Sequence, residues 1–477
     1  MSIQKTFLGA AAMSSASIFR LVMQFLAIPI LARLLSPSDY GIASMAMPFV
    51  IFSLSLADAG IGISLVRCPE QNEQEWSSSF WMTIAAGFAL TILLAALSPL
   101  AAMALSEPEV APVLSSLSIV ILLQSISTIP GARMQRDQRY GVIARIEIIA
   151  ITASLGSAVL IAYYGGGAWA LVTQQLVFYA VRMFLTLIFS TFKPIWKFSP
   201  SLIKHHAEFG LSILSANILS MITSSCENWI IGRNLGSYTI GTFSMAMQLC
   251  RLPIMLVTGP LGSPLYSHLS RIDNIFHVRE TFLLLTRMMS MLIFPAMAVS
   301  AVASEPLIHT LLSQKWTEAA HIYAYMAPAA AIQTVVTLSN AVLMALGKPR
   351  LQMRCALEYM LIWVPFLLFI VNFGINTIAI SYSIILTIYN VRKIFISTKY
   401  IGIKLQNYTI SLLPSVCISI IAVYIYYACE KLLNLNEIYL SLISILTIIV
   451  TTSLGFLCDY KTIITGFASL KEDYKDN

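Results

Sequence analysis

Long apolar runs, each close to the length of a membrane-spanning helix, recur along all 477 residues of the chain. A bilayer core about 30 Å thick is crossed by about 20 helical residues. Charged residues make up 11% of the chain, whereas a soluble globular domain carries about 25%. Because so few charged side chains cannot cover a water-facing surface, most side chains must face lipid or other helices. The sequence therefore predicts an all-α protein that spans the membrane many times.

A scan for apolar segments of sufficient length predicts about fourteen membrane-spanning helices. Their expected ranges are 9–32, 40–66, 80–105, 112–132, 143–165, 168–191, 209–231, 239–264, 282–303, 321–345, 352–371, 374–396, 409–429 and 438–458. Gly165-Gly166-Gly167 must form a very short hairpin between the fifth and sixth spans. The first span is interpreted as a helix rather than a signal peptide, because its apolar stretch is too long.

Basic residues gather on one side of these predicted spans. With the N-terminus placed in the cytoplasm, 19 of the 29 lysines and arginines fall in cytoplasmic segments and 4 on the opposite side. Such an excess is typical of cytoplasmic loops. We therefore expect both termini in the cytoplasm and an even number of spans. The net charge of +7 is scattered over loops and forms no basic face, which argues against nucleic acid as a partner.

Two segments 200 residues apart resemble each other. Residues 32–47 read ARLLSPSDYGIASMAM and residues 232–247 read GRNLGSYTIGTFSMAM, with seven of sixteen positions identical. Each segment is expected to be the loop between the first two spans of its half. A weaker echo at an offset of 209 relates Gln124 and Arg145 to Gln333 and Arg354.

The repeat predicts a division of the chain into lobes. Because six spans separate its two copies, the halves have the same topology, and a substrate site is expected between parallel repeats of this kind. We expect an N-terminal six-helix lobe over 1–200 and a C-terminal six-helix lobe over 201–404. Residues 405–477 then supply two additional helices and a short cytoplasmic tail.

Polar residues within the predicted spans are the candidate functional residues, because a charge in hydrocarbon is costly and turns toward a cavity or a partner. Polar residues fall on one face of each of the first, seventh and eighth spans. The substrate-cavity candidates on these faces are Arg20, Gln24, Glu227, Gln248 and Arg251. The offset of 200 places Arg20 opposite Ser220 and Arg251 opposite Ile51. The two halves are thus expected to share an arrangement of helices but not their charged residues. Such an asymmetry suits an asymmetric ligand.

A second group of intramembrane residues has coupling and structural interpretations that both stay open. The coupling or structural charges are Asp58, Arg145, Glu147, Arg354 and Glu358. Snorkelling to the membrane surface explains arginines near span ends, and Arg182 and Arg287 belong with these. Glu147 and Glu358 are each expected to neutralise a neighbouring arginine between packed helices.

The motifs of catalytic and cofactor sites are missing from the sequence. Its seven cysteines include no CxxC pair, which predicts neither disulfides nor a zinc site. The sequence has no P-loop, no HExxH and no nucleophile elbow. We therefore expect a protein that is not an enzyme and binds no metal or cofactor. Transport must be driven by an ion gradient, the membrane potential or the substrate gradient.

Three segments carry a resemblance to a known family. Residues 31–41, LARLLSPSDYG, followed by ADAGIG at 57–62, resemble the early signature of Wzx-type polysaccharide flippases. The stretch from Arg251-Leu252-Pro253 to Pro264-Leu265 is similar to the eighth span of colanic-acid-type exporters. These flippases belong to the multidrug/oligosaccharidyl-lipid/polysaccharide superfamily, and fourteen helices in two lobes agree with that fold.

The resemblance implies a function that composition alone does not show. It implies a bacterial inner-membrane flippase for oligosaccharide repeat units linked to undecaprenyl diphosphate, coupled to H⁺ or Na⁺ and working beside polysaccharide polymerase machinery. Arg20 and Arg251 would contact the diphosphate, and Glu227 would couple an ion or contact sugar. A cation-coupled multidrug exporter of the same superfamily is the nearest alternative. A membrane polysaccharide polymerase or ligase and an assembly partner of that machinery are further alternatives.

Overall fold

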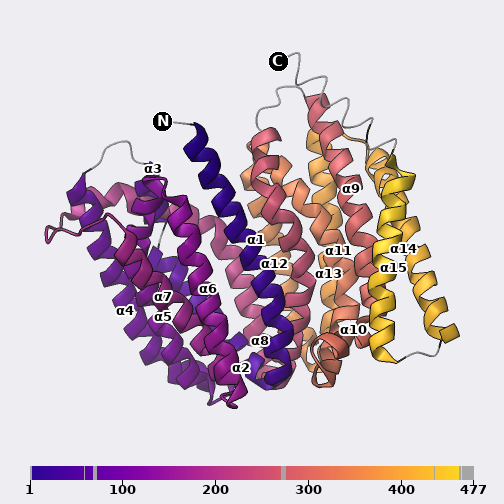
Figure 1. The fold of residues 1–477 in the computed structure, drawn as a ribbon, viewed down its shortest axis with the longest axis horizontal. Helices are drawn as coiled ribbons and strands as arrows, with labels where there is room; N and C mark the ends of the chain where they lie inside the picture. The colour runs from indigo at the N-terminus through magenta and orange to yellow at the C-terminus, as the bar shows by residue number, and fades with distance from the viewer. Residues whose placement is uncertain are drawn as a thin grey trace. The chain divides into compact units, whose positions relative to one another are not determined.

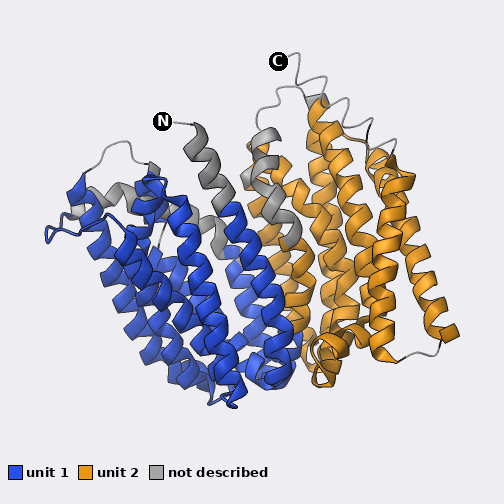
Figure 2. Ribbon diagram, in the orientation of Figure 1, with its two compact units in different colours: residues 1–244 blue, residues 245–477 orange. Residues whose placement is uncertain are grey.

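All regular secondary structure in the part of the chain that the computed structural model describes is helical (Figure 1). The described backbone covers residues 3–58, 60–67, 72–269, 275–433, 436–460 and 464. Side chains are described over the same ranges except at 3–12, 67, 200–218, 220, 256–269, 275–276 and 349. The predicted all-α class is confirmed for these residues. The chain forms two compact units, residues 1–244 and residues 245–477 (Figure 2).

Unit 1 is built around α5, which packs mainly against α2, α4 and α7 and also contacts α3 and α6. The α6 helix packs between α1 and α7. The helices of this unit are α1 (Ile3–Leu34), α2 (Pro37–Asp58), α3 (Ile61–Arg67), α4 (Glu73–Leu105), α5 (Val110–Arg136), α6 (Tyr140–Tyr163), α7 (Trp169–Phe189) and the first part of α8 (Pro200–Leu269).

Unit 2 is centred on α9, which packs against α11, α14 and α15, while α11 also packs against α13. Val299 and Ala303 on and just after α9 form a buried cluster with Ala422 and Tyr426 of α14. The two C-terminal helices therefore pack directly onto the rest of this unit. Its helices after α8 are α9 (Ile275–Val302), α10 (Ser304–Leu311), α11 (Thr317–Ala345), α12 (Pro349–Ile370), α13 (Ile375–Ile401), α14 (Leu405–Leu433) and α15 (Glu437–Cys458).

Twelve helices among the described residues are long and apolar enough to span a membrane. Each overlaps one of the predicted spans, from Met13–Leu34 at the N-terminal end to Glu437–Cys458 near the C-terminal end. The other two predicted spans, 209–231 and 239–264, lie within α8, where many side chains fall outside the description. The total of fourteen spans, the cytoplasmic position of both termini and the three-part division into lobes stay predictions.

The structure corrects the loop expected between the seventh and eighth spans. Residues 232–247 belong to α8, and their only non-helical residue is Gly236, at φ 83° and ψ 174°. This backbone conformation is essentially restricted to glycine, so one residue makes the break that a loop was expected to make. At the offset of 200, Gly236 corresponds to Ser36, which lies between α1 and α2.

Directly after these two breaks, α2 and α8 approach each other at a pair of glycines. A Cβ atom added to Gly41 would lie 1.8 Å from the backbone oxygen of Ser237. A Cβ added to Gly241 would lie 1.8 Å from the backbone oxygen of Pro37. The contacts are reciprocal at the offset of 200, as at a local two-fold axis. Small residues allow such close approach of membrane helices.

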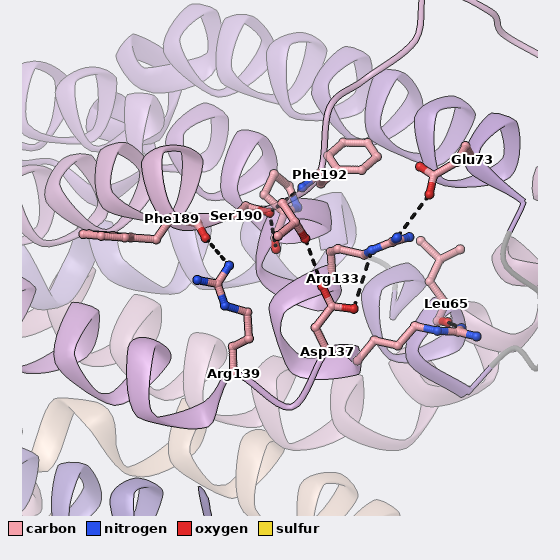
Figure 3. Close-up of polar contacts among 11 residues, drawn as sticks. Leu65, Glu73, Arg133, Asp137, Arg139, Phe189, Ser190 and Phe192 are labelled. Atoms are coloured by element: carbon pink, nitrogen blue, oxygen red, sulfur yellow. Dashed lines mark hydrogen bonds and ion pairs between the residues drawn. The ribbon is translucent and has the colours of Figure 1, made fainter. Parts of the chain in front are cut away.

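Basic residues at the C-terminal end of α5 connect several helix ends of unit 1 (Figure 3). Arg133 pairs with Glu73 of α4 at 3.1 Å, and Arg139 donates to the backbone oxygen of Phe189, at the end of α7, at 2.6 Å. Arg136 donates to the backbone oxygen of Leu65 in α3 at 2.9 Å. Because the last carbonyls of a helix lack intrahelical donors, Arg136 and Arg139 satisfy groups that would otherwise need water.

Candidate functional site

An intramembrane cluster of charged residues joins four helices of unit 1. Arg20 of α1 forms an ion pair with Glu147 of α6. Arg182 of α7 pairs with the same carboxylate at 3.0 Å, measured from Nε to Oε1. Arg182 also donates from Nη1 to Oε1 of Gln124 on α5 at 3.3 Å. These four residues are called the Glu147 cluster below, and all of them lie within predicted spans.

The two arginines of the Glu147 cluster differ in exposure. The carboxylate side chain of Glu147 is only 9% exposed, and that of Arg182 is 33% exposed. The Arg20 side chain is 54% exposed. A guanidinium carries five N–H donors, and two arginines against one carboxylate leave a net charge of +1 on the cluster. Arg20 therefore has both the charge and the donors to bind an anion while it is held by Glu147.

Unit 2 contains a small cavity beside Arg251. Its volume is about 220 Å³, and Arg251 and Gln333 supply the long polar side chains of a mainly apolar lining that includes Met247, Met326 and Leu386. Arg251 is exposed and Gln333 is half-buried. Gln248 is half-buried and does not line this cavity. An arginine and an amide side by side can donate several hydrogen bonds to an oxygen-rich ligand.

Unit 2 also contains a counterpart of the Glu147–Arg182 ion pair. Glu358 of α12 pairs with Arg392 of α13 at 2.8 Å and with Arg354, one turn away on its own helix, at 3.4 Å. In each unit, a carboxylate on one helix thus pairs with an arginine on the next membrane-spanning helix. This arrangement supports a packing role for both carboxylates, and it sets Arg20 apart as a third partner contributed by another helix.

The other predicted residues lie outside these contacts. Arg145 is exposed, and its Nε donates to the backbone oxygen of Gly141 on its own helix. Gln24 and Asp58 are half-buried, Asp58 at the end of α2. Glu227 is 6% exposed on α8. Asp58 lies within electrostatic reach of Arg182 of the Glu147 cluster, but no hydrogen bond or ion pair among the described residues joins it to that cluster.

Two glutamines that contact or lie beside arginines were missed as site residues. Gln124 belongs to the Glu147 cluster and Gln333 lines the Arg251 cavity. The sequence held a signal for both, because they are the paired positions of the echo at an offset of 209. Arg182, expected to reach the membrane surface from a span end, instead pairs with Glu147. Arg287, expected to do the same, pairs with Asp459 just after α15.

The chemistry of these sites is that of binding. Within the described residues, no group of three or more His, Cys, Asp and Glu side chains is placed to hold a metal ion. The side chains that gather in the Glu147 cluster and the Arg251 cavity offer cations, amides and one paired carboxylate. Such groups hold phosphate or sugar oxygens by charge-assisted hydrogen bonds.

Comparison with known proteins gives matches across most of the chain. A family model described as "Polysaccharide biosynthesis protein" matches residues 30–321. The lipopolysaccharide biosynthesis protein WzxC of Escherichia coli K12 is 22% identical over 348 residues, which cover 72% of this chain and 70% of that protein. The succinoglycan biosynthesis transport protein ExoT of Rhizobium meliloti is 26% identical over 301 residues, or 62% of this chain and 60% of that protein.

A solved structure shares the fold. The lipid II flippase MurJ, in an inward closed conformation, superposes with a TM-score of 0.76 at 16% sequence identity. The match covers 96% of this chain and all of that one. The architecture of the twelve described spans is therefore that of MurJ, although identity this low carries the fold alone.

Proposed function

The chain belongs to the polysaccharide biosynthesis protein family, and on that premise we propose that it flips undecaprenyl-diphosphate-linked oligosaccharide repeat units across the membrane. The family, the similarity to WzxC and ExoT, and the resemblance to Wzx-type flippases in residues 31–41 and 57–62 agree with one another. It is a multi-pass protein of the bacterial inner membrane. The repeat units would serve exopolysaccharide, capsule or O-antigen synthesis.

The exposed guanidinium of Arg20 is the observation that carries this proposal. A diphosphate and a string of sugars cannot cross hydrocarbon unaided, because burying unpaired charges and hydroxyls costs several kcal/mol for each group. Arg20 lies in a membrane-spanning helix, more than half exposed, in a cluster with a net positive charge. A planar guanidinium binds phosphate oxygens in pairs, so it suits the diphosphate in particular.

Glu147 would set the strength of this contact. Its carboxylate neutralises part of the charge of Arg20 and Arg182, so that the anion is bound but not trapped. A carrier needs this balance, because a ligand that binds too tightly in one state is not released in the other. Arg251 and Gln333 would contact a polar part of the same substrate during alternating access. Glu227 stays the proposed coupling carboxylate, with H⁺ or Na⁺ as the ion.

The multidrug exporter alternative predicts a different balance of charges. A site for cationic drugs needs unpaired carboxylates, whereas in the Glu147 cluster the carboxylate already pairs with two arginines. The net charge of +1 on this cluster would repel a cationic drug. The family match and both named relatives belong to polysaccharide biosynthesis.

Deletion of the gene in its own bacterium separates these functions. We expect loss of a surface polysaccharide and accumulation of its lipid-linked repeat unit on the cytoplasmic leaflet, with both defects reversed by the wild-type gene. Sensitivity to a panel of cationic drugs should stay unchanged. Normal glycan together with altered drug sensitivity would establish the exporter instead, and loss of polymer with repeat units already on the outer leaflet would indicate a polymerase or ligase.

A further inference from the structure

An apolar groove of about 660 Å³ lies between α2, α4 and α8 within unit 1. This volume falls in the range of pockets that hold small ligands. Its lining is almost wholly apolar and includes Phe52, Leu97 and Trp229. These three side chains remain 41%, 43% and 38% exposed, so the groove is open along its length. None of the four residues of the Glu147 cluster lines it.

A cation is fixed at one end of this groove. Arg233 follows Trp229 by one helical turn, and its guanidinium lies 5.5 Å from the centroid of the Trp229 ring. Its Nη1 donates to the backbone oxygen of Ala104 at 3.0 Å. Trp229 and Ala104 both line the groove. Arg233 itself is exposed, and its remaining donors are available to a ligand.

The position of Arg233 along the helices matches a membrane surface. Ala104 lies in the last turn of α4, which ends at Leu105, and α4 spans the bilayer by length and composition. Arginine and tryptophan side chains are typical of the interface between hydrocarbon and headgroups. In the described part of the chain, no ion pair joins Arg233 to a carboxylate. The groove thus offers an apolar channel that ends at an unneutralised cation in the interface.

We propose that the α2–α4–α8 groove is a binding site for an anionic phospholipid of the bilayer. One acyl chain lies along Phe52 and Leu97, and the phosphate accepts hydrogen bonds from Arg233. Charge complementarity selects this occupant: a neutral lipid leaves the guanidinium without a counterion, and a wholly apolar partner helix desolvates it without compensation. The site is independent of the proposed flipping activity.

The internal repeat supplies a matched control residue. Arg33 corresponds to Arg233 at the offset of 200 and is also exposed. One turn before Arg33 stands Pro29 instead of tryptophan. Arg33 does not line the groove. Substitution of Arg33 therefore removes the same charge from the equivalent position without affecting the proposed lipid site.

Photo-crosslinking of a lipid probe to the full-length purified chain tests the proposal. Two probes carry a diazirine in the acyl chain, one on phosphatidylglycerol and one on phosphatidylcholine, and crosslinked peptides are mapped by mass spectrometry. We expect phosphatidylglycerol to label the peptides that contain Leu97 and Cys226 several-fold more than phosphatidylcholine does. Arg233→Gln should remove this preference, and Arg33→Gln should keep it.

A second variant addresses the groove itself. Leu97→Trp fills the groove without changing any charge, and it should reduce labelling by both probes at these peptides while labelling near the exposed Cys417 of α14 stays constant. Equal labelling by the two probes in the wild-type chain would overturn the proposal. So would a phosphatidylglycerol preference that survives Arg233→Gln.

Discussion

Arg20 is distinguished by being a second arginine on the Glu147–Arg182 ion pair, contributed by a third helix, α1, with a side chain that is more than half exposed. The Glu147–Arg182 pair has a counterpart in Glu358–Arg392, so this pair is explained as part of the packing of consecutive helices. Arg20 has no arginine counterpart, because the offset of 200 leads to Ser220. Its charge is therefore surplus to the packing and is available for a ligand.

Replacement of Glu147 should test the structural part of this interpretation. Glu147→Gln leaves Arg20 and Arg182 next to each other without a neutralising carboxylate. Breaking a buried ion pair costs about 3 kcal/mol, so we expect the free energy of unfolding in detergent to fall by about that amount. Glu109→Gln, at an exposed position just before α5, is the control and should change it by less than about 1 kcal/mol. A Glu147→Gln protein as stable as the wild type would contradict the packing role.

A double-mutant cycle on Glu147 and Arg182 should then measure their coupling. We expect Glu147→Gln and Arg182→Gln to be non-additive by about 1 kcal/mol or more, because the two side chains are in direct contact at 3.0 Å. The cycle of Glu358→Gln and Arg392→Gln in the other unit should give a coupling of the same sign. Additive effects within each cycle would mean that these contacts contribute nothing to stability.

The sequence predicted which charged residues take part in the Glu147 cluster better than it predicted which of them contact each other. Arg20 and Glu147 were recognised separately, since a charge within an apolar run is conspicuous. Their pairing was not predictable, because 127 residues separate them and the neighbours of a helix depend on how the whole bundle packs. The echo that relates Gln124 to Gln333 was the available signal for the missed glutamines.

At the scale of helices, the crossing of α2 and α8 depends on glycine at two positions. At each glycine, the space that a Cβ atom would need is occupied by a backbone oxygen of the other helix. A backbone oxygen cannot rotate away as a side chain can. We expect Gly41→Ala and Gly241→Ala each to lower the free energy of unfolding by about 1–3 kcal/mol, the range for overpacking. Thermal unfolding of the two variants should give matching losses, since the contacts are reciprocal. Full stability in either variant would contradict the close approach.

Substitution of Gly236 should act through a different cause from substitution of Gly41 or Gly241. An added Cβ would meet no atom within 4 Å, but the residue has a φ of 83°. The cost of Gly236→Ala therefore comes from backbone strain alone, and we expect about 1–3 kcal/mol. Asparagine gains little here, because its enrichment at positive φ is mostly in the αL region, whereas Gly236 has a ψ of 174°; Gly236→Asn should therefore cost about as much as Gly236→Ala. Wild-type stability of either variant in thermal unfolding would contradict a glycine-restricted backbone conformation at this position.

Helix positions were more predictable than helix connections. Apolar length alone located twelve described spans, because the thickness of the bilayer imposes it on every spanning helix. The break in α8 was expected as a loop, since sequence patterns do not distinguish a loop from a single residue with positive φ. The Gly165-Gly166-Gly167 hairpin was predictable, and the structure places Gly165 and Gly167 at φ 78° and 53° between α6 and α7.

At the scale of the whole molecule, the sequence repeat predicts two related halves that carry different charges. The reciprocal contacts at Gly41 and Gly241 and the equivalent ion pairs of Glu147 and Glu358 support a common frame. Arg20 pairs with Glu147, whereas Arg233 lies against the ring of Trp229. A symmetric scaffold does not require such differences, whereas an amphiphilic substrate with one charged end does. The proposed flippase uses the frame for alternating access and the surplus cation for the diphosphate.

Polysaccharide export by Arg20 variants in the deletion strain tests this proposal most directly. At equal expression, we predict that Arg20→Ala lowers export at least about tenfold, as the loss of a charge-assisted hydrogen bond of about 1.5–3 kcal/mol implies. Lipid-linked repeat units should accumulate on the cytoplasmic leaflet. Arg20→Lys should retain part of the activity, because it keeps the charge but not the planar fork, and Arg33→Ala should export normally. Export by Arg20→Ala at the wild-type rate would contradict the assignment of Arg20 to the diphosphate.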